Sequence, residues 1–294
     1  MKSANGSTVE RIRLAVVRHI ARARRVLRHP TLDDNAVHEA RKDLKRARSG
    51  LRLLRPLDEA GYLRENMRLR DCGRRLAAVR DDKVLLALLG RLLEDEKKPA
   101  RRQLLVALRR DLRKARRRDW NALRTAERTH RIEDSLATAA RHVRAWRTPP
   151  EADGAPSFAL RRLYRKGRKA LARSERKPTD ERLHEARKQA KHLAQALEIL
   201  AGKKPRKKAR KVLDRAGEVG DRLGDDDDLA VVDSRLAAQP SGDPKGKKKL
   251  HSHIDARRAR LQKKALNAAE KLFRKKTRRV LAAAAAPEAG TTAA

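Results

Sequence analysis

The sequence is poor in aromatic residues and cysteine and has no long apolar run. Aromatic side chains make up 2% of its 294 residues. Proteins that bind single-stranded nucleic acids usually stack bases on aromatic rings, so this chain has little with which to read bases. The single cysteine, Cys72, excludes an internal disulfide and a zinc site built from cysteines. A reducing, intracellular compartment fits this composition.

The N-terminal segment has the pattern of neither a signal peptide nor a membrane span. Arg11, Arg13 and Arg18 interrupt the apolar residues between positions 9 and 20. A membrane-spanning helix needs about 20 predominantly apolar residues in succession. We therefore expect a cytoplasmic protein without a transmembrane segment.

Negative charge is also scarce relative to positive charge. The chain has 78 Lys and Arg against 38 Asp and Glu, and its formal net charge is +40. An excess of this size is typical of proteins that bind polyanions. A polyanionic partner is the first functional inference from composition.

One stretch occurs twice, 146 residues apart. Residues 37–56 read VHEARKDLKRARSGLRLLRP, and residues 183–202 read LHEARKQAKHLAQALEILAG. The five residues His-Glu-Ala-Arg-Lys are identical in the two copies. A repeat at this separation indicates that a helical unit has been duplicated.

Each copy has an apolar face and a basic face at the period of an α-helix. Exposed helix faces usually mix cations with acids at i,i+4 spacing, whereas these faces have cations and almost no acids. A bound anion would explain this pattern, and an ordinary solvated outer face is the alternative. The basic faces comprise His38, Arg41, Lys42, Lys45 and Arg52 in the first copy, and His184, Arg187, Lys188 and Lys191 in the second.

The rest of the sequence predicts an all-α fold, because no alternating pattern typical of strands exceeds four residues. A segment rich in Pro and Gly near 148–156 separates a first half, about 9–147, from a second, about 157–282. We expect both ends, 1–8 and 283–294, to be disordered. We also expect helices to begin at Arg80–Asp82 and after Asp225–Asp228, where acids would cap them.

The paired HEARK helices resemble those of the CHAD family, the conserved histidine α-helical domain. Each is followed after roughly 40 residues by a segment containing Asp, at 76–81 and 223–231, and the resemblance extends over about 9–280. It implies two four-helix bundles related by pseudo-twofold symmetry, with a basic groove or pore between them. It also implies binding of inorganic polyphosphate and association with polyphosphate granules.

Polyphosphate is a flexible chain of charged groups without bases. Cations that recur every helical turn, about 5.4 Å apart, form a ladder that successive phosphates could follow. Arg supplies forked donors to phosphate oxygens and Lys a mobile point charge. We expect Asp81 and Asp228 to orient arginines, while the basic segments 101–118 and 203–211 either extend the groove or keep the protein dissolved. Additional candidates for phosphate contacts are Arg18, Arg22, Arg48, Arg165 and Arg168.

The two repeated histidines have two possible roles. Neighbouring cations disfavour protonation of His38 and His184, so each would gain a proton when phosphate arrives, and affinity would rise from pH 8 to pH 6. Alternatively, both form hydrogen bonds inside the fold. Metal ligation is disfavoured because the nearby Lys and Arg repel a divalent ion, so we expect no metal and no cofactor.

The sequence therefore predicts a polyphosphate-binding module. It has no Gly-rich phosphate loop and no nucleophile elbow, so we predict no catalytic activity. The main alternative is a histone-like protein that binds nucleic acids non-specifically, since the net charge attracts any of them at low salt.

Overall fold

The structure, a computed structural model, describes residues 7–28, 32–202, 205–239 and 243–274. These residues form ten α-helices and one short 3-10 helix, η1, and they include no strand, which confirms the all-α prediction. The helices are α1 (Thr8–Leu27), α2 (Asp34–Leu54), α3 (Glu59–Arg75), α4 (Ala77–Asp95), α5 (Pro99–Leu123), α6 (Ala126–Arg144), α7 (Ala155–Arg176), α8 (Asp180–Ala201), α9 (Lys207–Ala237) and α10 (Pro244–Phe273), with η1 at Pro150–Gly154.

Side-chain caps fix the starts of the two repeated helices. The Asp33 carboxylate accepts a hydrogen bond from the backbone N–H of Ala36 at the start of α2. The Thr179 hydroxyl accepts one from Arg182 at the start of α8. Such caps satisfy backbone donors that have no partner inside the helix. Ser7 caps α1 in the same way, so the expected disorder over 1–8 does not extend to residues 7 and 8, whereas 283–294 lie outside the described residues.

Two predicted helix starts are wrong. Arg80–Asp82 lie inside α4, which begins at Ala77, and Asp225–Asp228 lie inside the 31-residue helix α9. Within the second run, Asp226 is 1% exposed and accepts hydrogen bonds from Arg258 and Gln262 of α10. Partners on a neighbouring helix satisfy this buried charge, so the chain can continue as a helix through four acids.

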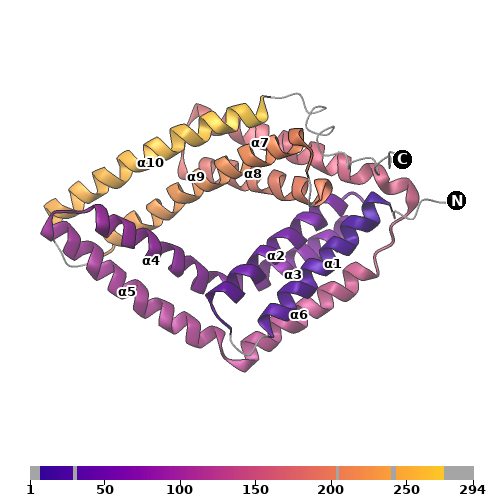
Figure 1. Ribbon diagram of the computed structural model, residues 1–294, viewed down its shortest axis with the longest axis horizontal. Helices are drawn as coiled ribbons and strands as arrows, with labels where there is room; N and C mark the ends of the chain where they lie inside the picture. The colour runs from indigo at the N-terminus through magenta and orange to yellow at the C-terminus, as the bar shows by residue number, and fades with distance from the viewer. Residues whose placement is uncertain (1–6, 29–31, 203–204, 240–242, 275–294) are drawn as a thin grey trace, which may run out of the picture.

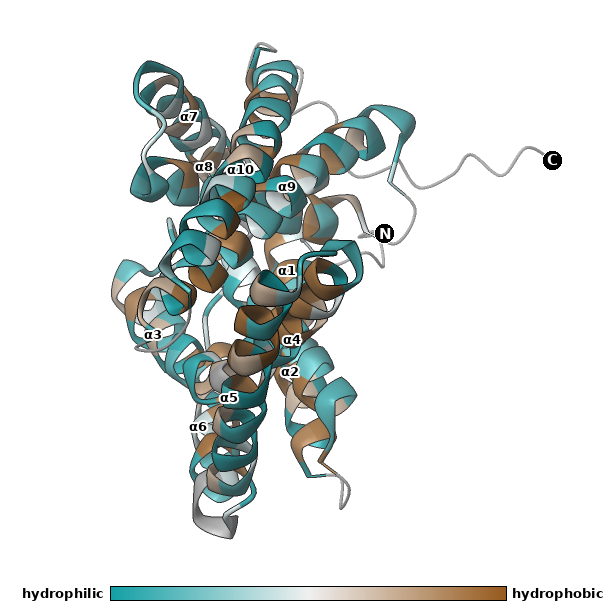
Figure 2. Ribbon diagram, turned by 90° about the vertical axis from the view of Figure 1, so that its left-hand side faces the viewer, coloured by the Kyte–Doolittle hydropathy of each residue, from teal (hydrophilic) through white to brown (hydrophobic). Residues whose placement is uncertain are grey.

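Three large apolar clusters hold together the helices drawn in Figure 1. The N-terminal cluster joins α1, α2, α3 and α6 and includes Leu44, Leu51 and Leu136. The C-terminal cluster joins α7, α8, α9 and α10 and includes Tyr164 and Leu197. The hairpin cluster packs α4 and α5 against the far parts of α9 and α10. Figure 2 shows apolar and polar residues on the same helices, as expected for helices buried on one side.

The first repeated helix, α2, connects the N-terminal and C-terminal clusters. Leu53 and Leu54 at the end of α2 belong to the C-terminal cluster, although the rest of α2 packs in the N-terminal one. Where α2 meets α8, Arg46 lies 3.6 Å from Glu198. Helix α9 likewise contributes to both the C-terminal and the hairpin clusters. Two four-helix bundles with a pseudo-twofold axis, and the domain limits given above, stay predictions.

Cys72 is buried in the N-terminal cluster, and its thiol lies 3.9 Å from the carbonyl oxygen of Ile132. Burial raises the pKa of this thiol to about 11. No helix in the described part of the chain is both long enough and apolar enough to cross a membrane.

The hairpin cluster should unfold separately from the N-terminal cluster. Leu105 of α5 is fully buried in the hairpin cluster, so Leu105→Ala should cost about 2–5 kcal/mol of stability. Hydrogen exchange should then accelerate in α4 and α5 more than in α1 and α6. Leu51→Ala, in the N-terminal cluster, is the comparison and should give the opposite pattern. Equal acceleration in both regions by both variants would contradict separate units.

Candidate anion-binding site

A cavity of about 1360 Å³ lies between the two repeated helices. Its wall is formed by α2 on one side and by α8 and α9 on the other, with contributions from α3, α4 and α7. The described wall residues include eleven Lys and Arg but seven Asp and Glu, so positive charge predominates. The cations are Arg41, Lys45, Arg48, Arg52, Arg55, Arg162, Lys166, Arg187, Lys188, Lys191 and Arg235, and the acids are Glu59, Asp81, Glu185, Glu198, Asp221, Asp227 and Asp228.

The same ion pair occurs once in each half of the wall. Arg41 of α2 lies 3.5 Å from Asp81 of α4, and it donates to the carbonyl of Gly73 at 2.9 Å. Arg187 of α8 pairs with Asp227 of α9, and both members lie 146 residues after their counterparts. These acids hold the two guanidinium groups in place at the cavity wall.

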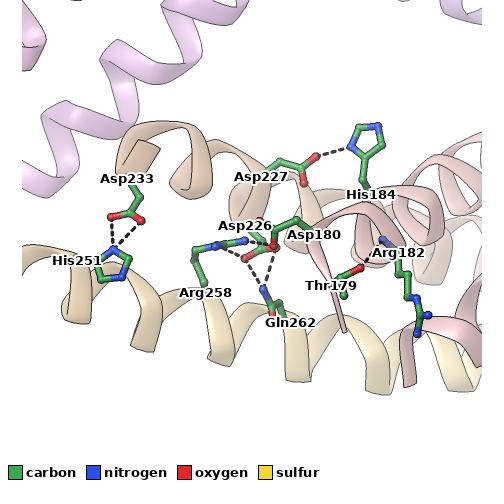
Figure 3. A network of polar contacts seen from close by, with 10 residues as sticks. All are labelled: Thr179, Asp180, Arg182, His184, Asp226, Asp227, Asp233, His251, Arg258 and Gln262. Atoms are coloured by element: carbon green, nitrogen blue, oxygen red, sulfur yellow. Dashed lines mark hydrogen bonds and ion pairs between the residues drawn. The ribbon is translucent and has the colours of Figure 1, made fainter. Parts of the chain in front are cut away.

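Asp227, and not the expected Asp228, is therefore the acid that holds Arg187. Its carboxylate also lies 3.2 Å from Nδ1 of His184 (Figure 3). Asp228 lies beside it in the wall, where burial raises the pKa of its carboxyl even though Arg187 acts to lower it. The repeat distance applied to Asp81 would have identified Asp227 from the sequence.

Two glycines of α9 make room for the cations of α8. A Cβ at Gly220 would lie 2.9 Å from Cε of Lys191, and a Cβ at Gly224 would lie 3.1 Å from a guanidinium nitrogen of Arg187. The glycines are four residues apart, as are the two cations, so one face of α9 accommodates one row of α8. Any larger side chain would push these cations out of position.

Six wall cations form no ion pair with an acid in the described part of the chain: Lys45, Arg48, Arg52, Arg162, Lys166 and Lys191. Burial, together with Arg41, Lys191 and Arg187, lowers the pKa of Lys45 to about 8. Burial and Arg48 lower the pKa of Arg52 to about 10. Burial is also the main cause that lowers the pKa of Lys166 and of Lys191. The cavity thus disfavours the charged forms of its own cations.

His192, which the sequence analysis did not select, lies in the wall near Arg48, Arg52 and Lys188. Burial and the charges of Arg52, Arg48 and Lys188 lower the pKa of its imidazole to about 2. It is therefore neutral at every physiological pH. Neighbouring cations were expected to disfavour protonation of His38 and His184. The structure shows this effect at His192.

A possible metal-ligand set lies outside the cavity. Asp233, His251 and Asp255 place three potential ligand atoms within 4.8 Å of one another. Nδ1 of His251 is 2.7 Å from Asp233, and Nε2 is 3.0 Å from Asp255. The hydrogen bond to Asp233 raises the pKa of this imidazole, so charge pairing accounts for the cluster.

Comparison with known proteins gives the family. A model of the CHAD domain matches residues 11–237. The chain belongs to the CHAD domain family.

Two solved structures resemble the whole fold. The CHAD domain from the plant Ricinus communis has a TM-score of 0.61 at 19% identity, with 96% of this chain and 93% of that chain covered. PptA from Streptomyces chartreusis has a TM-score of 0.63 at 18% identity, with 92% and 98% covered. No curated protein matches the chain.

Within this CHAD domain, the structure brings most of the predicted site residues together. Both basic faces turn towards one cavity, and Arg48 joins them there. Outside the wall, Lys42 lies 3.2 Å from Glu39. The wall contains Arg41, Lys45, Arg48, Arg52, His184, Arg187, Lys188, Lys191, Asp81 and Asp228, whereas His38, Lys42, Arg18, Arg22, Arg165 and Arg168 lie outside it.

Helix α7 supplies wall residues that the sequence analysis missed. Arg162 and Lys166 lie one turn apart on α7 and face the cavity. Arg55 follows the end of α2, and Arg235 is on α9. The spacing of Arg48, Arg52 and Arg55 after Arg41 and Lys45 could have identified Arg55, because the five positions form one helical stripe. The α7 residues belong to no repeated motif.

Lys45 should titrate near pH 8, well below the usual value of about 10.4 for lysine. Lys191→Gln removes one of the charges that lower the pKa of Lys45, so the pKa should rise in this variant. NMR titration of isotope-labelled lysine side chains, with Lys45 assigned by Lys45→Gln, measures both values. Lys249 of α10, which is exposed, serves as the internal reference. An unchanged pKa of Lys45 in the Lys191 variant would contradict the proximity of these charges.

Proposed function

We propose that this CHAD domain binds inorganic polyphosphate in the cavity between α2 and α8. The supporting observation is the group of wall cations without acidic partners. Lys45, Arg52, Lys166 and Lys191 have lowered pKa values in a space lined mainly by positive charge. A polyanion would supply the missing counter-charge and make the charged forms favourable again.

The shape of the cation row favours a chain over a single anion. On α2, the wall residues run from Arg41 to Arg52 and continue to Arg55 beyond the helix end. Fourteen residues of helix span about 21 Å. Each turn offers a new donor, so successive phosphates of one chain can be bound along the row.

The aromatic residues of the wall do not favour a nucleic acid. Tyr62 is 7% exposed, and Phe158 is the other aromatic residue among the described wall residues. Sequence-tolerant binding of single strands stacks successive bases on several rings. The cavity can therefore recognise phosphate but has little to hold bases.

Different wall cations would make different kinds of contact with the phosphate chain. Arg41 and Arg187, each held by an acid, present guanidinium groups in fixed orientations for forked hydrogen bonds. Lys45 and Lys191 supply point charges that adapt to a moving chain. Neutral His192 can donate a hydrogen bond without adding charge. Release of counterions from the polyanion would contribute much of the affinity.

The family supports this reading. CHAD domains are known as polyphosphate-binding modules and not as a catalytic family. The repeated Arg–Asp pairs are consistent with two four-helix bundles that arose by duplication and are related by a pseudo-twofold axis. Association with polyphosphate granules follows as part of the same proposal.

Neutralising four of the unpaired cations should remove binding without harming the fold. In the cavity variant, Lys45, Arg52, Lys166 and Lys191 are changed to Gln. Four lost charge-assisted contacts should weaken binding of long-chain polyphosphate at least about 100-fold. The melting temperature should stay equal or rise, because repulsion between buried cations is relieved. Calorimetry measures both quantities.

The matched control changes four exposed lysines of α10, Lys248, Lys249, Lys263 and Lys264, to Gln. It has the same net charge as the cavity variant, so a similar loss of affinity in both would mean that only total charge matters. In a competition assay at about 0.15 M salt, polyphosphate should displace DNA at equal phosphate concentration. Displacement of polyphosphate by DNA would instead favour the histone-like alternative.

Gly220→Ala should weaken polyphosphate binding, because the new methyl group displaces the side chain of Lys191. We expect a loss of about threefold to thirtyfold, within the range for one charged hydrogen bond. Gly90→Ala in α4 is the control, since a Cβ there meets no atom within 4 Å and the residue lies outside the cavity wall. Equal affinity of the two variants would show that the position of Lys191 is not important.

A further inference from the structure

The cations of α5 are of two kinds. On the side facing the protein, Arg101 lies 3.0 Å from Glu96, and Arg116 lies 2.5 Å from Asp34 of α2. Arg102 donates to the carbonyl of Glu96 at 2.9 Å. These three cations have partners that fix α5 to its neighbours, so their role is structural.

On the opposite side of α5 lies an outer stripe of Arg110, Arg113, Lys114 and Arg117. All four are exposed, and they fall at i, i+3, i+4 and i+7. The one ion pair of the stripe within the described residues is between Arg110 and Asp111, 3.8 Å apart, with both side chains more than half exposed. An exposed ion pair of this kind contributes little to the stability of the helix. Like charges at this spacing destabilise a helix, so the stripe does not serve the stability of α5.

The outer stripe is separate from the cavity. No residue of α5 belongs to the described cavity wall, whereas Asp81 and Leu85 of α4 do. Helix α5 packs against α4 through the hairpin cluster, with Leu105 and Leu112 buried there. Figure 1 shows α5 along the outer edge of the helical frame. A short polyanion bound inside the cavity would leave the outer stripe accessible.

We propose that the outer stripe binds a second chain of inorganic polyphosphate, so that one molecule bridges two chains. The inference rests on the proposed function of the cavity. Bridging requires two binding surfaces that can be occupied at once, and these two lie on different helices. Linking chains in this way would condense polyphosphate, which binding in the cavity alone does not do.

The geometry of the stripe favours polyphosphate over a nucleic acid. The stripe is one helix face wide and convex, which suits a single file of phosphates. Duplex DNA presents two backbones, and a single strand needs rings for its bases. Trp120 at the end of α5 is half-buried, and the guanidinium of Arg124 covers its ring at 4.8 Å.

A two-step capture tests the bridge. Beads that carry short polyphosphate chains capture the full-length protein at about 0.15 M ionic strength, and excess protein is washed away. Fluorescent long-chain polyphosphate is then added, and its retention is measured. In the stripe variant, Arg110, Arg113, Lys114 and Arg117 are changed to Gln. The α10 variant described above again matches the change in charge.

The wild type and the α10 variant should retain the second chain. The stripe variant should be captured in the first step to the same extent, but should retain about tenfold less of the second chain. Equal retention by the stripe variant and the wild type, or no retention by the wild type, would overturn the proposal. Retention of labelled DNA but not of polyphosphate would overturn the assignment of the ligand. Failure of the first step would instead contradict the function proposed for the cavity.

Discussion

The central constraint on the structure is that apolar packing must hold mutually repelling cations around one cavity. Three apolar clusters position six helices so that eleven Lys and Arg face a common space with seven acids. Burial, together with the neighbouring cations, lowers the pKa values of Lys45 and Arg52. Apolar packing stabilises an arrangement that its own charges oppose, and the opposition is relieved when an anion enters.

The fold separates cations that hold the structure from cations that are available to a ligand. Arg187 is fixed by Asp227, and Arg258 serves buried Asp226 by linking α10 to α9. Lys45 and Lys191 have no such partner among the residues that the structure describes. On α5 the two kinds occupy opposite faces of one helix. A count of charges cannot distinguish these groups, but the location of acidic neighbours can.

Helical periodicity predicted the fold class and which side of each repeated helix is buried. The apolar arcs are confirmed: Leu51, Leu54 and Leu197 are fully buried. Because Arg41, Lys45 and Arg52 fall within about 40° of one another around α2, beside that arc, their common position in the wall followed from the sequence. Lys42, one residue after Arg41, lies about 100° around the helix and falls outside the wall.

Features that depend on contacts between distant segments could not be predicted in this way. Four consecutive acids resemble a helix start until Arg258 and Gln262, more than 30 residues later, pair with Asp226. Arg162 and Lys166 enter the wall because α7 packs beside α8 in the C-terminal cluster, and no local pattern indicates this. The role of Gly220 and Gly224 is evident only from the tertiary structure, where the side chains of Lys191 and Arg187 pack against them.

The burial of Cys72 has a practical consequence. Its thiol has a pKa of about 11 and is 3% exposed, so little of the reactive thiolate exists at neutral pH. A cysteine engineered at a cavity mouth or on α5 would therefore react with a maleimide probe far faster than the native one. The natural sequence can thus serve as a background for spectroscopic labelling without first removing its own cysteine.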